Sequence, residues 1–118
     1  MRQPPSIDSF GAGGFRVSGQ WRPGSLLILD DQPQDWRPRD LGDLSMADFA
    51  EVIAGGLALS EFVLLGTGTV QAQPPAAVRT GLRQAGLGLE FMTTANAART
   101  WGVLVSQGRR LALALLCV

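Results

Sequence analysis

Three short apolar runs in the second half of the chain, separated by two segments with helix signals, constrain the fold most strongly. The runs are "FVLL" at 62–65, "LGLEFM" at 87–92 and "RLALALLCV" at 110–118. Between them, Pro74 and Pro75 predict a helix to about Ala85, and Thr94 predicts the cap of a second helix that continues to about Gln107. Strands joined through helices lie parallel, with right-handed crossovers. The pattern therefore predicts a β-α-β-α-β unit with three parallel strands and helices packed against them.

The N-terminal half alternates short apolar stretches with glycine-rich turns, a pattern typical of β-strands. We expect strands around Ile7–Ser9, Phe15–Val17 and Leu26–Leu29, which form an antiparallel layer over part of the parallel sheet. The polar, proline-containing stretch "DDQPQDWRPRD" at 30–40 predicts a loop. Residues 1–6 predict a flexible arm.

A further helix is predicted to start near Ser45, because its hydroxyl can cap the first turn and Asp48 stands at the capping-box position. Gly55 and Gly56 predict the end of this helix. At 118 residues the chain has the size of one domain. The predicted fold is therefore α/β: a flexible arm at 1–6, then a single compact layered domain at 7–118 whose antiparallel N-terminal strands precede the β-α-β-α-β unit.

Charge and hydropathy limit the partners and the compartment. Ten acidic and ten basic residues balance, so no charge excess favours a nucleic acid partner. No apolar run reaches the roughly 20 residues of a membrane span. The N-terminal segment "MRQPPSIDSF" lacks the apolar core of a signal peptide. We expect a cytoplasmic protein without a membrane span.

Missing residue types remove much catalytic chemistry. The chain has no histidine and no lysine, and Cys117 is its single cysteine. Without histidine, Ser-His-Asp and Cys-His systems and His-ligated zinc are excluded, and without lysine there is no Schiff base. One cysteine can form neither an intrachain disulfide nor a multi-cysteine metal site. We predict no catalytic residues, no metal and no cofactor, and a non-enzymatic protein is favoured.

The turn Gly66-Thr67-Gly68 follows the first apolar run and resembles the start of a nucleotide site, where a glycine turn joins a strand to a helix. The dinucleotide fingerprint, however, needs a third glycine where Gln71 stands, and the two prolines that follow delay the helix by about a turn. A P-loop would need a lysine. The segment is therefore interpreted as a structural turn or a small-anion nest.

Topology still points to a ligand position near this turn. In open α/β sheets, ligands bind at the carboxyl ends of the parallel strands. The predicted anion or carboxylate site consists of Gly66, Thr67, Gly68, Thr94 and Arg99. In the alternative interpretation, which is favoured, Thr94 is an ordinary helix cap and Arg99 pairs with a carboxylate such as Glu90.

The order of several motifs resembles a known family. They are "FGAGGFRVSG", "GSLLIL", "FVLLGTG", the Pro-Pro helix and "GLGLEFMTTANAARTWGVLVSQGRRLALALL". From about Ile7 to Leu116 the chain resembles domain of unknown function 498, a family that includes a mitochondrial assembly factor for respiratory complex I. The resemblance implies a compact layered α/β fold with a hammerhead-like N-terminal portion, and no established catalytic activity. The chain departs from the family pattern at Thr93, Ala98 and Trp101-Gly102.

Two functions remain. The first is a non-enzymatic protein-interaction or assembly module with a protein partner, and the resemblance links it to respiratory complex biogenesis. The second is a domain that binds a small anion or carboxylate at the glycine turn. A dinucleotide-dependent oxidoreductase is disfavoured by the incomplete fingerprint. The sequence leaves a homo-oligomer open.

Overall fold

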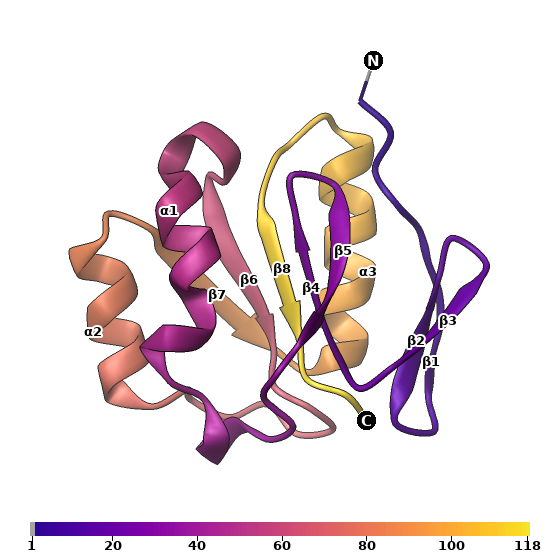
Figure 1. Ribbon diagram of the computed structural model, residues 1–118, viewed down its shortest axis with the longest axis horizontal. Coiled ribbons are helices and arrows are strands. Elements are labelled where there is room, and N and C mark those ends of the chain that lie inside the picture. Colours follow the sequence, from indigo (N-terminus) through magenta and orange to yellow (C-terminus); the bar gives the residue numbers. More distant parts are fainter. Residues whose placement is uncertain (1) are drawn as a thin grey trace.

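A five-stranded mixed sheet runs through the middle of the domain, with helices on both faces and a second, three-stranded antiparallel sheet beside it (Figure 1). The computed structural model describes residues 2–118. The strands are β1 (Ile7–Gly11), β2 (Gly14–Val17), β3 (Gln20–Pro23), β4 (Ser25–Leu29), β5 (Gln32–Trp36), β6 (Phe62–Gly66), β7 (Gly88–Met92) and β8 (Ala112–Leu115). The helices are α1 (Ala50–Leu59), α2 (Ala76–Gln84) and α3 (Thr94–Ser106), with short 3-10 turns η1 (Leu41–Asp43) and η2 (Met46–Phe49) before α1.

The large sheet has the strand order β5-β4-β8-β6-β7. Strand β6 pairs in parallel with both β7 and β8, so the predicted β-α-β-α-β unit with three parallel strands is confirmed. Strand β8 also pairs antiparallel with β4, and β4 pairs antiparallel with β5. All four residues of the central strand β8 are buried, as expected for an apolar strand covered on both faces. Strands β1, β2 and β3 form an antiparallel N-terminal layer, as expected, but β3 was not predicted. The strand expected at Leu26–Leu29 lies within β4, which belongs to the large sheet and not to this layer.

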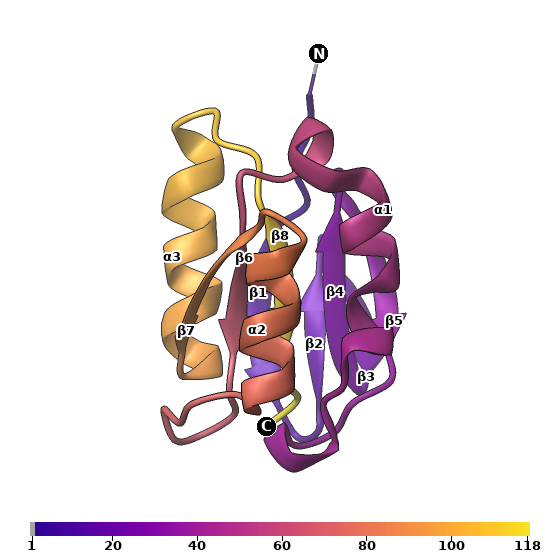
Figure 2. The same cartoon turned by 90° about the vertical axis from the view of Figure 1, so that its left-hand side faces the viewer.

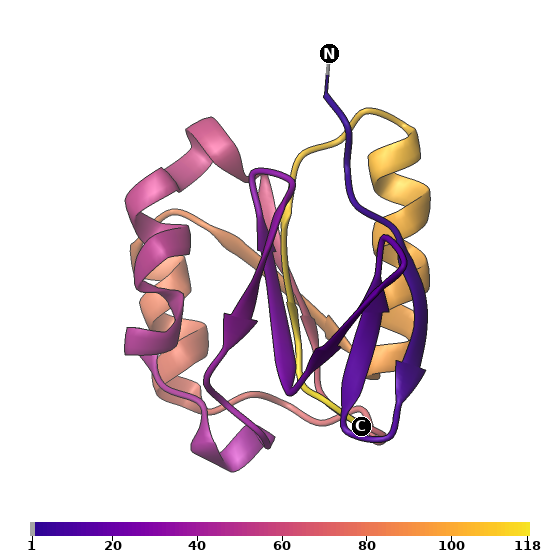
Figure 3. The same ribbon diagram turned by 45° about the vertical axis from the view of Figure 1, so that its right-hand side comes forward.

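Alternate residues of the central strands supply two separate cores. On one face, α1 and α2 cover a cluster that includes Ala112 and Ala114. On the other face, α3 and β2 cover a cluster that includes Leu113 and Leu115. Figure 2 shows α2 and α3 on opposite sides of the large sheet, and Figure 3 shows the small sheet on the side of α3. Because β6, β7 and β8 are parallel, their carboxyl ends meet at one edge between these layers.

The stretch expected to be a loop contains strand β5, and that expectation was wrong. Asp30 and Asp31 have φ of 52° and 62°, which is the geometry of a type I′ hairpin turn, and Leu29 pairs with Gln32 directly across it. Pro33 is tolerated because β5 lies at the edge of the sheet and needs hydrogen bonds on one side only. The polar composition of this segment therefore gave no sign of β5, because an edge strand pairs with one neighbour only.

The helical segment starts where it was predicted, but its end was placed wrongly. The backbone N–H and the hydroxyl of Ser45 donate to Asp48 Oδ2 at 2.9 Å and 3.2 Å, which orders the η2 turn ahead of α1. Gly56 has a φ of 56°, so it kinks the helix instead of ending it. Helical structure resumes and continues to Leu59 because glycine accepts this positive φ at little cost.

The N-terminal segment runs alongside the domain. Arg2 Nε donates to Asp31 Oδ2 at 2.8 Å, which ties the segment to the β4–β5 turn. Met1, part of the predicted arm, lies outside the described residues, and the flexibility of the arm stays a prediction. Between residues 2 and 118, no helix is both long enough and apolar enough to cross a membrane.

Candidate functional site

The Gly-Thr-Gly turn at the end of β6 is held by hydrogen bonds to the next two strand ends. The N–H of Thr67 donates to Met92 O at 2.8 Å, and that of Gly68 donates to Thr94 Oγ1 at 3.0 Å. In return, Thr94 N–H donates to Gly68 O at 2.9 Å, and its hydroxyl donates to Leu116 O at 2.8 Å. The Thr94 side chain is fully buried. It therefore connects the ends of β6 and β8 to the start of α3.

Gly66 allows the helix to approach the strand closely. A Cβ atom at this position would lie 2.9 Å from Thr94 Cα and 2.7 Å from Leu115 Cδ2. Neither neighbour has free space to move into, because both belong to the buried core. The first glycine of the turn is thus explained by packing of α3 against β6.

The cap of α3 is one residue earlier than expected. Thr93, not Thr94, is the capping residue, and its hydroxyl accepts from Asn96 N–H at 3.2 Å. Two consecutive threonines made the choice ambiguous, since either hydroxyl could cap. The Thr94 hydroxyl instead points into the domain, where it accepts from Gly68 N–H and donates to Leu116 O.

The predicted cation of the site makes its side-chain hydrogen bond within α3 and not to the turn. Arg99 is exposed, and its Nη2 donates to Asn96 Oδ1 at 2.6 Å on the same helix. Glu90 is exposed on the edge strand β7. Among the ion pairs formed within residues 2–118, none joins Arg99 to Glu90. The structure therefore brings Gly66, Thr67, Gly68 and Thr94 together without Arg99.

A groove of about 320 Å³ opens next to the turn, and a different arginine lines it. Its lining residues are Arg39, Asp40, Leu41, Thr67, Gly68, Thr69, Val70, Ala72, Leu116, Cys117 and Val118. Arg39 is exposed and its Nη1 lies 4.0 Å from Cys117 Sγ. Arg39 was not among the predicted site residues, because its segment was expected to be a polar, proline-containing loop.

The loop that carries Arg39 is anchored two residues earlier. Arg37 donates to Asp48 through Nε and Nη2, both at 2.8 Å, and to Asp43 Oδ2 at 3.0 Å. These hydrogen bonds from Arg37 hold the pKa of the Asp48 carboxyl below its ordinary value, against a smaller opposing effect of burial. The same pairing raises the pKa of Arg37. Arg39 therefore projects from a segment with fixed geometry.

Nothing in residues 2–118 resembles a metal centre, since no three His, Cys, Asp or Glu side chains gather to hold an ion. The groove offers backbone donors instead. The amides of Thr69 and Val70 find no acceptor within the described chain, and both residues line the groove together with Arg39. This arrangement can bind a small anionic or carbonyl group.

The protein is a small layered α/β domain with a glycine turn at the carboxyl edge of its parallel strands, and a groove opens beside that turn. The chain belongs to the family described as "Protein of unknown function (DUF498/DUF598)", whose model matches residues 7–116. An uncharacterised protein of Rhodobacter capsulatus is 37% identical over 110 residues, which are 93% of this chain and 82% of that protein.

Two further proteins are similar to this chain over most of its length. NADH dehydrogenase (ubiquinone) 1 alpha subcomplex assembly factor 3 of Rattus norvegicus is 27% identical over 93% of this chain. The match spans 59% of the rat protein, which is therefore considerably longer. The crystal structure described as an outer membrane protein from Bartonella henselae superposes with a TM-score of 0.88 at 27% identity, covering 99% of this chain and 98% of that chain.

Proposed function

We propose that this protein is a non-enzymatic assembly module that binds a subunit of a respiratory NADH dehydrogenase during biogenesis. The observation that carries this proposal is the similarity to the rat assembly factor, which extends over 93% of the chain and so involves the whole folded domain. The proposal assigns the domain surface, not a catalytic pocket, as the functional element.

Trp21 on the small sheet is the side chain best suited to anchor a protein partner. It is 41% exposed, and a Cβ atom at Gly14 would lie only 2.8 Å from its Cζ2, so the indole ring lies over the glycine backbone. The ring is thus presented in a fixed orientation. Rigid, half-exposed tryptophans often dominate the binding energy of protein interfaces. We therefore place the partner contact on the outer face of β2 and β3.

Affinity capture in the organism that encodes the protein tests this assignment. The tagged chain should retain subunits of the NADH dehydrogenase, and deletion of the gene should lower the amount of assembled enzyme on native gels. Trp21→Ala should reduce capture by about tenfold or more. Leu57→Ala is the matched control, because Leu57 is equally apolar and 67% exposed but lies on α1. An unchanged amount of assembled enzyme in the deletion strain would refute the proposed function.

A second candidate function is binding of a small anion or carboxylate in the groove beside the glycine turn. The free amides of Thr69 and Val70 and the guanidinium of Arg39 favour it. Arg39 replaces Arg99 as the cation in this proposal. Titration with phosphate and with succinate, followed by thermal shift, provides the test. Arg39→Gln should abolish any stabilisation and Arg99→Gln should leave it intact, and equal responses of the two variants would contradict the site.

A further inference from the structure

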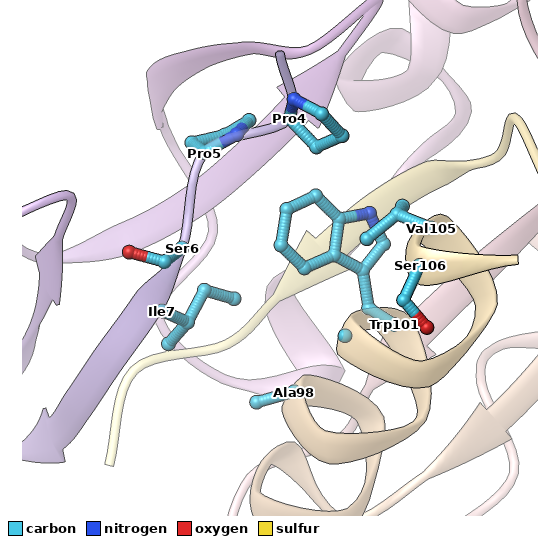
Figure 4. A pocket seen from close by; sticks show the side chains of 9 residues that line it. Pro4, Pro5, Ser6, Ile7, Ala98, Trp101, Val105 and Ser106 are labelled. Carbon is cyan, nitrogen blue, oxygen red and sulfur yellow. The ribbon is translucent and has the colours of Figure 1, made fainter. Parts of the chain in front are cut away.

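A second groove, distinct from the one beside the glycine turn, lies between the N-terminal segment and α3. It has a volume of about 390 Å³, within the range of small-molecule sites. Figure 4 shows Pro4, Pro5 and Ile7 on one side and the Trp101 indole extending towards them from α3. Its lining residues are Pro4, Pro5, Ser6, Ile7, Ala98, Trp101, Gly102, Val105 and Ser106.

The walls of this groove carry no ionisable side chain. Its two hydroxyls are already committed within the protein: Ser6 Oγ donates to Asp8 Oδ1 at 2.7 Å, and Ser106 Oγ donates to Val103 O at 2.6 Å. A charged ligand would lose its hydration here without gaining a partner of opposite charge. The groove therefore selects for a neutral, largely apolar occupant.

Among the side chains that line the groove, the indole of Trp101 carries a donor without a partner. Trp101 is 2% exposed, yet its indole N–H has no acceptor within residues 2–118, and it is not among the fully enclosed polar atoms. Trp101 lines the groove, and Figure 4 shows its indole nitrogen beside Val105, which lines the groove as well. The N–H of Trp36, in contrast, donates to Asp48 O at 2.9 Å. A buried tryptophan N–H is normally paired, so the Trp101 donor is available to a ligand acceptor.

We propose that the groove between the N-terminal segment and α3 binds a neutral, mostly apolar small molecule that bears a single carbonyl or hydroxyl acceptor, which takes the hydrogen bond from Trp101 Nε1. The proline rings and Ile7 enclose the apolar body of the ligand from the side opposite α3. The site is independent of the proposed partner contact, because Trp21 does not line it.

Gly102 provides a way to close the groove without disturbing the core. It lines the groove from within α3, and a Cβ atom added there would meet no atom within 4 Å. Leucine at this position fills the space with its side chain, and it favours the helix more than glycine does. Gly102→Leu should therefore fold and block the site. Gly102→Ala is the matched control, because its single methyl leaves most of the groove open.

The test follows the tryptophan indole N–H signals by ¹⁵N–¹H NMR during titration with three related probes. The probe 2-acetylnaphthalene has an acceptor, 2-ethylnaphthalene has the same shape without one, and 2-naphthoate is charged. We expect 2-acetylnaphthalene to move the Trp101 signal downfield and to leave those of Trp21 and Trp36 in place. We also expect 2-ethylnaphthalene to bind up to about tenfold more weakly, as befits the loss of one neutral hydrogen bond. The charged probe should not bind.

Variants distinguish the contribution of the open groove to binding from that of the Trp101 N–H donor. Gly102→Leu should abolish binding of 2-acetylnaphthalene and Gly102→Ala should retain it, while Trp101→Phe should reduce its affinity to that of the ethyl compound. The proposal is overturned if the Trp101 signal does not move up to the solubility limit of the probe, if 2-naphthoate binds as tightly, or if Gly102→Leu binds normally. A dimer in light scattering that Gly102→Leu dissociates would also overturn it, since the occupant would then be a second copy of the chain.

Discussion

The hydroxyl of Thr94 should contribute more to stability than any other single polar atom around the glycine turn. Thr94→Val keeps the shape of the side chain but leaves the Leu116 carbonyl and the Gly68 N–H without their partner. An unsatisfied buried group costs about 1–3 kcal/mol, and Gly68 is only half-buried, so we expect a total loss of about 2–4 kcal/mol. For 118 residues the unfolding entropy is about 0.25 kcal/mol per kelvin, which converts this loss into a Tm lower by about 8–16 °C.

Thermal unfolding followed by circular dichroism measures this effect, with Thr94→Ser as the matched control. Serine keeps both hydrogen bonds and loses only one methyl group, which costs roughly 1 kcal/mol or about 4 °C. We expect the valine variant to melt well below the serine variant. If the two variants melt at the same temperature, the hydroxyl does not hold the strand ends together and the account of the turn is wrong.

Three other predictions concern packing and charge. Gly66→Ala should destabilise the fold by roughly 1–3 kcal/mol in urea titrations, because its Cβ would meet fixed core atoms. Gly81→Ala should destabilise less than Gly66→Ala, since its Cβ would meet Cγ, Sδ and Cε of the half-buried Met46 side chain, which can shift, while alanine gains about 1 kcal/mol of helix propensity. Arg37→Gln should be less stable than the wild type at pH 6. Because the folded-state pKa of Asp48 is lowered, this difference is present above the ordinary carboxyl pKa of about 4 and disappears as pH falls through the lowered pKa, which urea titrations at pH 6 and pH 2.5 will show.

The parallel half of the fold could be predicted because its signals are local. The apolar runs at Phe62–Gly66 and Ala112–Leu115 are almost entirely buried, and their short length and flanking turn residues distinguish them from the helices. Strand β5 could not be predicted in this way, since an edge strand with one neighbour carries little apolar pattern. The antiparallel pairing of Leu26 with Leu115 was also out of reach, because it depends on residues far apart in sequence.

Part of the candidate site could be predicted from the sequence, because those residues lie next to predicted strands and helices. Gly66, Gly68 and Thr94 follow directly from strand ends, and the structure brings them together. The cation of the groove was not predictable, because Arg39 reaches it through a loop whose path depends on the pairing of Arg37 with Asp48. The lesson is that motif residues within an element can be placed from sequence, whereas long side chains from loops need the tertiary structure.

The position of β8 has a consequence for how the domain acquires its structure. It is the last of the eight strands along the described chain, yet it stands between β4 and β6, which do not pair with each other. The β4–β5 hairpin and the β6–β7 pair therefore remain two separate fragments with open edges until residues 112–115 insert between them. We expect the sheet to close only after the ribosome has released this segment, in a slow step dominated by long-range contacts. Until then the nascent chain exposes two unpaired strand edges, which makes it a natural client for chaperones.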